Sequence, residues 1–155
     1  MDKGTNATNI KSSHGVGDNK YHMEFCPKYR HDVMDSSISA EMKQILMQIA
    51  EEKGILVHKI VVDVDHVHIF VSLPFWMSVS LALQYLKGIS SYKIFRLHPE
   101  FREKKFRKGA FWSPGHFSRS VSCITESTVE QYIDKHEYPK YFPTDDKKQT
   151  RLQFN

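Results

Sequence analysis

The sequence has little cysteine and no long apolar run, and both absences exclude classes of protein. Cys26 and Cys123 are the only cysteines, and they lie too far apart for the paired spacing of a zinc knuckle. We therefore expect two reduced thiols rather than a disulfide framework. No apolar run approaches the roughly 20 residues of a membrane span, and the N-terminus lacks the apolar core of a secretion signal. Together these absences predict a cytoplasmic protein.

The rest of the composition is that of a folded globular protein. Hydrophobic residues make up 40% of the 155-residue chain, which is enough for one domain that buries a core without disulfides. The formal charge of +4 suits a polyanionic partner, but so small an excess favours nucleic acid only slightly. Composition therefore bounds the class of protein and leaves the function to local motifs.

The chain divides into three parts by composition. Residues 1–19 are polar and rich in Gly, Ser, Asn and Lys, which predicts a disordered leader. Residues 20–138 carry the hydrophobic periodicity and are predicted to form a single domain. Residues 139–155 are polar and charged, which predicts a mobile C-terminal tail.

Within the domain, hydrophobic periodicity predicts alternating strands and helices. The two central strands should form an antiparallel hairpin, because their connection is short. The predicted elements are a strand over 20–26, a helix ending at Gly54, strands over 55–64 and 66–73, a helix over 78–97, short strands over 110–113 and 117–124, and a last helix after Thr125 or Ser127. This order predicts an α+β, ferredoxin-like fold: a split βαβ antiparallel sheet, as in RNA-recognition domains, with helices on one face and a C-terminal helix that carries Tyr132.

The strongest functional signal is a histidine pair in the segment from Asp63 to Val71. A strand turns alternate side chains to opposite faces, so His66 and His68 should project from one side of the sheet. Two imidazoles on one face can share a divalent metal ion with a further ligand. A His-x-His pair alone is more often structural, so the prediction depends on what lies nearby.

The second signal is Tyr132 with His136, which lie one turn apart on one face of the predicted helix. A phenol has an ordinary pKa of about 10, and a nearby cation would lower it enough for Tyr132 to act as a nucleophile. The same cation would polarise a phosphate oxygen. His136 is the predicted third metal ligand. Asp63 is the alternative because carboxylates suit Mg²⁺ and Mn²⁺, although strand alternation argues against it unless the chain turns before His66.

Cations interleaved with aromatic residues form a candidate nucleic-acid surface. Some follow the first strand, and others extend from the second helix toward residue 108. Such a run is a solvated charged face about as often as it is a surface that neutralises phosphates and stacks bases. The candidate DNA contacts are Tyr29, Arg30, Lys87, Lys93, Arg96, Lys104 and Lys105.

Several of these residues lie in motifs of a known family. His66-Val67-His68 resembles the His-hydrophobe-His motif of the HUH endonucleases, and the chain from Lys20 to about Tyr138 resembles the single-tyrosine transposases of the IS two-hundred-like insertion sequences. Five segments in the same order carry this resemblance: Phe25–Arg30, Asp65–His68 with Val71–Pro74, Leu86–Ser91, Phe111–Gly115, and Thr125–Glu126 leading to Tyr132–Ile133.

The resemblance implies a transposase that binds single-stranded DNA with a hairpin near the element end and uses Mg²⁺ or Mn²⁺. Tyr132 would cut one strand to leave a 5′-phosphotyrosine and a free 3′-hydroxyl, and the strands would then be rejoined. His66 and His68 would be metal ligands. The family implies a homodimer in which the tyrosine helix of one subunit can serve the histidine pair of the other. The sequence departs from the family at His136, where glutamine is common.

Three other functions remain open from the sequence. The same HUH chemistry serves replication initiation or the processing of palindromes. A ferredoxin-like sheet is also the scaffold of non-catalytic nucleic-acid-binding modules, although the aromatic pattern of the RNA-binding strands is absent here. A metal-dependent hydrolase would release a 5′-phosphate and retain no DNA.

Overall fold

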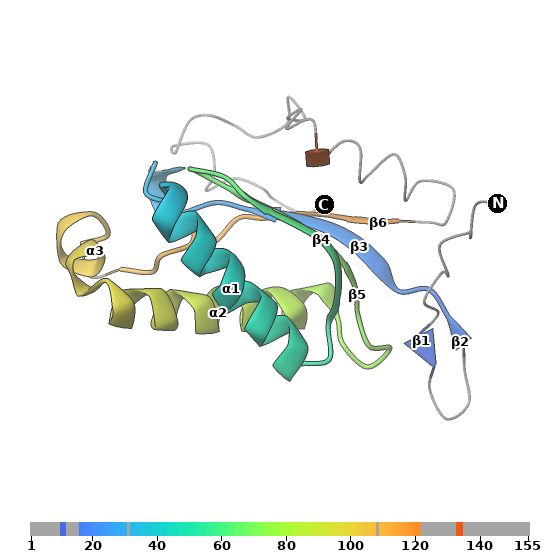
Figure 1. The fold of residues 1–155 in the computed structure, drawn as a ribbon. Coiled ribbons are helices and arrows are strands. Elements are labelled where there is room, and N and C mark those ends of the chain that lie inside the picture. The colour runs from blue at the N-terminus through green and yellow to red at the C-terminus, as the bar shows by residue number, and fades with distance from the viewer. Residues whose placement is uncertain (1–9, 12–15, 31, 108, 122–132, 135–155) are drawn as a thin grey trace, which may run out of the picture.

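The computed structural model describes residues 10–11, 16–30, 32–107, 109–121 and 133–134. Four strands of this part form one antiparallel sheet in the order β4–β5–β3–β6 (Figure 1). Their bounds are Lys20–Phe25 for β3, Leu56–Val62 for β4, Val67–Ser72 for β5 and Phe117–Ser120 for β6. Strands β3 and β5 are central in the sheet, as in a split βαβ unit. The predicted α+β ferredoxin-like fold is confirmed.

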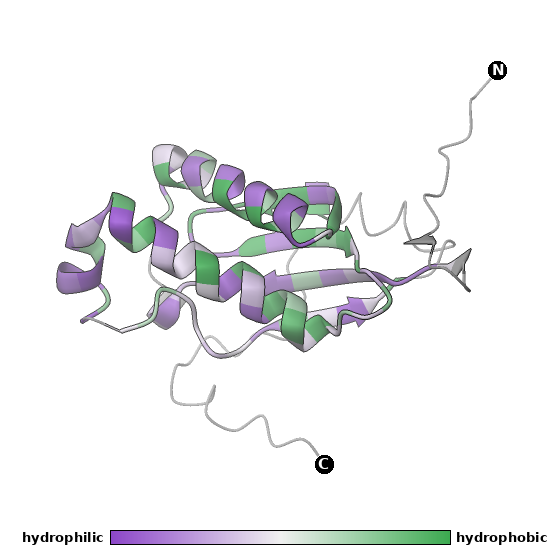
Figure 2. Cartoon of the chain, turned by 90° about the horizontal axis from the view of Figure 1, so that it is seen from below, coloured by the Kyte–Doolittle hydropathy of each residue, from purple (hydrophilic) through white to green (hydrophobic). Residues whose placement is uncertain are grey.

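Two long helices, α1 (Ser36–Glu52) and α2 (Val79–Leu97), lie side by side across one face of the sheet (Figures 1 and 2). The Asp35 carboxylate caps α1 by accepting hydrogen bonds from Ser37 and Ile38 at 3.0 Å, and the Ser78 hydroxyl caps α2. The expected start and end of α2 are confirmed. A short helix that the sequence did not predict, α3 (Pro99–Lys104), follows α2.

The hydrophobic core lies between these helices and the sheet. Alternate residues of the central strands face it, among them Met23 and Phe25 of β3 and Val67 and Ile69 of β5, and all are essentially inaccessible to solvent. The helices contribute the apolar stripes that the periodicity predicts. Because each strand commits one side to this core, its other side is available for different chemistry.

The register of the sheet fixes which residues share that other side. Glu24 of β3 pairs with His68 of β5, and His22 pairs with Phe70. Val61 of β4 pairs with His68, and Phe117 of β6 pairs with Glu24. Directly paired residues of an antiparallel ladder point to the same face. The sheet therefore brings polar groups from β3 and β5 together on the face opposite the helices.

Outside the sheet, β1 (Ile10–Lys11) and β2 (Val16–Gly17) form a small antiparallel pair within the segment predicted as a leader. The segment 110–113, predicted as a strand, makes only a single bridge, between Pro27 and Trp112. Among the described residues, no helix combines the length and apolar character needed to cross a bilayer.

Candidate active site

The face of the sheet opposite the helices carries buried ionisable residues at alternate positions of β3. Lys20, His22 and Glu24 are each at most 5% exposed. Burying such groups is costly unless partners compensate, so their presence in a small domain marks a site where electrostatics matter. The sequence predicted a strand here, but His22 and Glu24 were not among the predicted site residues. The alternation that singled out His66 and His68 applies equally to His22-x-Glu24.

The two histidines predicted as metal ligands lie next to each other. Their ring centroids are 4.7 Å apart with the rings nearly perpendicular, and both side chains are buried. His66 ends the turn that connects β4 to β5, where its carbonyl accepts a hydrogen bond from the Asp63 amide at 2.9 Å. The predicted common face of the pair is therefore present in the fold.

A carboxylate contacts the Nδ1 atom of each of these histidines. Asp65 Oδ1 lies 2.6 Å from His66 Nδ1, and Glu24 Oε1 lies 3.1 Å from His68 Nδ1. In metal sites a carboxylate on one ring nitrogen fixes the tautomer and leaves the other nitrogen to face the metal. With Nδ1 engaged in this way, Nε2 of each ring is the nitrogen left to ligate a cation.

His22 joins this cluster from the neighbouring strand. Its Nε2 lies 3.2 Å from His68 Nδ1 and 3.4 Å from Glu24 Oε1. Burial lowers the pKa of His22 to about 4, although Glu24 opposes that shift. Burial also lowers the pKa of His66, although its hydrogen bond to the Asp65 carboxylate opposes that shift. Both imidazoles are therefore neutral at neutral pH, which is the form that ligates metals.

These donors fit a divalent cation. The ligand atoms of His22, Glu24 and His68 lie within 4.8 Å of one another, and all three residues are buried. Imidazole and carboxylate together suit ions such as Mn²⁺. The described residues therefore offer one such group, His22 with Glu24 and His68, and it shares His68 with the predicted pair His66 and His68.

The residues that follow Tyr132 in the chain pack on the same face of the sheet. Ile133 is fully buried in a cluster with Phe70 and Val121, and Asp134 forms an ion pair with Lys59 of β4. Phe70 is two residues from His68 and pairs with His22. Figure 1 shows the short helical piece Ile133–Asp134 above the sheet, on the side away from α1 and α2.

The other residues predicted for this site are Tyr132, His136 and Asp63. Tyr132 and His136 lie outside the described residues. Asp63, the alternative third ligand, accepts a hydrogen bond from the Val64 amide at 2.7 Å in the turn before His66. That contact ties the Asp63 carboxylate to the turn.

Comparison with known proteins identifies the family. Residues 16–136 match the sequence profile of the family described as "Transposase IS200 like". The chain belongs to the IS200-like transposase family. It is 32% identical over 115 residues to the ISDra2 transposase TnpA of Deinococcus radiodurans, a match that covers 74% of this chain and 81% of the relative. It is 31% identical over 118 residues to the transposase for insertion sequence element IS200 of Salmonella typhimurium, covering 76% of each.

Solved structures agree with this assignment. A crystal structure of a Deinococcus radiodurans R1 protein assigned as a transposase superposes with a TM-score of 0.67 at 26% identity, covering 84% of this chain and 99% of that one. A REP-associated tyrosine transposase bound to a REP hairpin shares the fold, with a TM-score of 0.55 at 13% identity and coverage of 94% and 88%.

In this IS200-like transposase, several predicted DNA contacts also make contacts within the protein. The Lys87 ammonium donates to the carbonyls of Pro114 and Gly115 at 3.2 and 3.3 Å, and burial lowers its pKa. Lys93 donates to Gln48 at 3.0 Å, and Arg96 donates to the Tyr92 hydroxyl at 2.9 Å. These bonds hold the side chains in place, and their role toward DNA stays a prediction.

The remaining predicted contacts include three that gather at one cavity. Tyr29, Lys104 and Lys105 line it, together with Arg107, which the sequence analysis did not select. Arg30 lies beside Tyr29 in the chain, but its side chain is outside the described part of the structure.

Proposed function

We propose that this transposase cleaves and rejoins single-stranded DNA, with Tyr132 as the nucleophile and a divalent cation held at His66 and His68. The observation that carries this proposal is the pair of buried imidazoles, each held by a carboxylate at Nδ1, on the sheet face where Ile133 packs. Ile133 directly follows Tyr132 in the chain, which supports the proposal that the tyrosine acts at this face of the sheet.

The cation proposed here is Mg²⁺ or Mn²⁺. Nε2 of His66 and His68 would hold it, with His136 as the proposed third ligand and Asp63 as the alternative. When bound, such a cation supplies positive charge that polarises a phosphate oxygen and favours the phenolate form of a nearby tyrosine. Asp65 and Glu24 hold the two imidazoles in the tautomer that presents Nε2.

The proposed reaction conserves phosphodiester bonds. The Tyr132 oxygen forms a bond to phosphorus while the bond from phosphorus to the 3′-oxygen breaks, and the phenolic proton is transferred to the departing 3′-oxygen. The products are a 5′-phosphotyrosine and a free 3′-hydroxyl. Attack by a 3′-hydroxyl on the phosphotyrosine reverses these changes and joins two strands. Covalent catalysis of this kind suits strand transfer better than hydrolysis, because the bond energy is kept.

Tyr132→Phe tests the nucleophile. We expect the wild-type protein with Mn²⁺ and single-stranded element ends to form a slower-migrating protein band that carries the 5′ end of the cut strand. Tyr132→Phe should abolish that band and keep DNA binding, because only the attacking oxygen is lost. Tyr85→Phe, which alters a tyrosine of α2 outside the candidate DNA contacts, is the matched control.

Other outcomes of the same assay would point elsewhere. A band that persists in Tyr132→Phe would remove Tyr132 from the role. Release of a free 5′-phosphate with no retained DNA would indicate a hydrolase, and binding without metal-dependent cleavage would indicate a non-catalytic module. Finding that palindromic ends do not flank the gene would favour replication initiation or palindrome processing by the same chemistry.

The proposed partners are a DNA hairpin and a second copy of the chain. The structure of the REP-associated relative contains a REP hairpin, which supports hairpin recognition as the way the element end is chosen. A homodimer would allow two ends to be cut and exchanged in one complex.

A further inference from the structure

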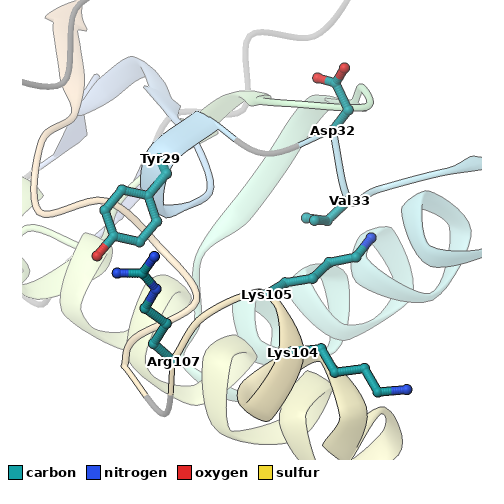
Figure 3. A pocket seen from close by; sticks show the side chains of 6 residues that line it. All are labelled: Tyr29, Asp32, Val33, Lys104, Lys105 and Arg107. Carbon is teal, nitrogen blue, oxygen red and sulfur yellow. The ribbon is translucent and has the colours of Figure 1, made fainter.

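A cavity of about 440 Å³ opens where the chain leaves the sheet after β3. Its lining combines one aromatic ring and three cations with one carboxylate: Tyr29, Lys104, Lys105, Arg107, Asp32 and Val33. In Figure 3 the Tyr29 ring and the Arg107 guanidinium lie together at one end, and Asp32 lies at the opposite rim. The volume is in the range of pockets that hold a small ligand, and the lining favours an anion.

The backbone at this cavity is held in an unusual conformation on both sides. Among the described residues, the two non-glycine residues with positive φ are Tyr29, at 64°, and Arg107, at 47°. Both line the cavity. Bulky residues rarely adopt this left-handed conformation, and it persists only where surrounding structure enforces it. The fold therefore tolerates a conformational cost at both residues, and both side chains line the same cavity.

Long-range contacts hold the backbone next to Tyr29 and Arg107 in place. The Lys28 amide donates to the Phe111 carbonyl at 2.7 Å, and the Ser113 amide donates to the Cys26 carbonyl at 2.9 Å, which fixes the backbone on either side of Pro27. On the other wall, buried Phe106 precedes Arg107 and packs on Phe111 with ring centroids 4.9 Å apart. The exposed lining residues therefore project from anchored backbone, which lowers the entropic cost of binding.

The cavity also lies at the end of the strands where the histidine pair is found. Tyr29 is four residues beyond Phe25, and Phe25 pairs with Val67, which lies between His66 and His68. The segment that lines the far wall continues to Met34, whose amide donates to the Val64 carbonyl at 3.1 Å. The cavity and the histidine pair therefore lie at the same end of the sheet.

We propose that the cavity binds one unpaired nucleotide of the single-stranded substrate, with its base on the Tyr29 ring and its phosphate held by Arg107, Lys104 and Lys105. An aromatic face stacks on any base, and the cations neutralise the phosphate. Lys28 Nζ lies 5.2 Å from the centroid of the Tyr29 ring and adds positive charge beside it. This inference rests on the proposed function only in taking single-stranded DNA as the substrate.

The test compares two strands of equal length, polythymidine and an abasic deoxyribose-phosphate chain, by fluorescence anisotropy in EDTA. Tyr29→Asn removes the ring while keeping a residue type that tolerates left-handed backbone. We expect it to reduce the preference of the protein for thymidine over the abasic strand by about tenfold, since stacking on one ring is worth about that much. Tyr29→Phe keeps the ring and should keep the preference, and a thermal melt reports whether either variant is folded.

Arg107→Gln should weaken binding of both strands equally and lower the slope of log affinity against log salt by about 0.7, as expected for one lost phosphate contact. Lys43→Gln, at an exposed position of α1 outside this cavity, is the charge-matched control and should lower that slope less. Because no metal is present, this assay is independent of cleavage. If the wild-type protein forms no covalent adduct but Tyr29→Asn still reduces the preference for thymidine, the proposed function is wrong and the cavity assignment is supported.

Two results would overturn the inference. A folded Tyr29→Asn protein with the wild-type preference for thymidine would show that no base stacks on the ring, even if Arg107→Gln lowers the salt slope. Equal losses of salt slope in Arg107→Gln and Lys43→Gln would show that the cavity cations act only through the overall charge.

Discussion

At the scale of single residues, the chemistry of the site depends on which ring nitrogen each histidine presents. Asp65 precedes His66 in the chain, so that contact is local, whereas Glu24 reaches His68 across the β3–β5 ladder. The orientation of His68 therefore depends on strand register, and a shift of one residue would move Glu24 to the opposite face.

Glu24→Gln should weaken Mn²⁺ binding by about 10- to 100-fold, the usual effect of removing a carboxylate that orients a metal-ligating histidine. The amide keeps the shape of the side chain and loses the charge that favours the correct tautomer. Isothermal titration calorimetry at fixed pH measures the affinity. Glu51→Gln, on the exposed side of α1, is the control. An unchanged affinity in Glu24→Gln would show that Glu24 does not support the metal site.

Substituting His22 and His66 one at a time distinguishes the two possible sets of metal ligands. If Nε2 of His66 and His68 hold the cation, His66→Ala should abolish measurable Mn²⁺ binding, while His22→Ala should reduce it only modestly. The reverse order would place the cation among His22, Glu24 and His68 instead. Electron paramagnetic resonance of added Mn²⁺ reports bound and free ion for each variant without any requirement for DNA cleavage.

At the scale of elements, three segments that carry the family resemblance support one another. Ser90 and Ser91 of α2 accept hydrogen bonds from Trp112 Nε1 at 2.8 Å and from the Phe111 amide at 3.2 Å. The same loop bonds to Cys26 and Lys28 after β3. These segments are distant in sequence, and their contacts explain why they form one structural unit beside the histidine pair.

A second contact between elements predicts a dependence of stability on pH. His98, at the C-terminal end of α2, lies 2.6 Å from Glu41 of α1, and that hydrogen bond raises the pKa of His98 above its ordinary value of 6.5. The contact therefore stabilises the fold fully below pH 6.5, and the stabilisation is lost as pH rises through the raised pKa. Both side chains are partly open to solvent, 22% for His98 and 37% for Glu41, so screening by water should keep the effect below about 1 kcal/mol.

Urea unfolding between about pH 6 and pH 8 measures this contribution. The difference between wild type and Glu41→Gln should be largest at the acidic end and should shrink toward the alkaline end. A difference that stays constant with pH would show that the ion pair contributes nothing that titrates.

Strand and helix periodicity predicted the sheet, both long helices and the common face of His66 and His68. Periodicity could not reveal His22 and Glu24 as neighbours of His68, because the register that joins β3 to β5 depends on contacts far apart in the chain. It also could not predict α3 or the left-handed backbone at Tyr29 and Arg107, which long-range bonds enforce.

At the scale of the whole molecule, the helices cover one face of the sheet (Figure 1), and the polar cluster occupies the other face. The face with the polar cluster also receives Ile133 and Asp134 of the same chain. In the proposed homodimer, a tyrosine segment that keeps these contacts would serve the histidine pair of its own chain, whereas the family resemblance allows exchange between subunits. The two arrangements make different predictions for mixed dimers.

Mixing His68→Ala with Tyr132→Phe distinguishes them. If the tyrosine acts within its own chain, no subunit of the mixed dimer has both a complete histidine pair and a nucleophile, so no covalent DNA adduct should form. This is the result expected if the contacts of Ile133 and Asp134 within one chain persist in the dimer. Adduct formation by the mixture, with neither variant active alone, would show that the tyrosine segment crosses between subunits.

In β3 and β5, residue number alone tells which face of the sheet a side chain occupies. In both strands the odd-numbered residues, such as Met23 and Ile69, belong to the core, and the even-numbered ones, such as Glu24 and His68, belong to the polar face. Substituting only the even positions would change the chemistry of the polar face without altering the core between the sheet and the helices. Substituting only the odd positions would change heat resistance while sparing the chemistry.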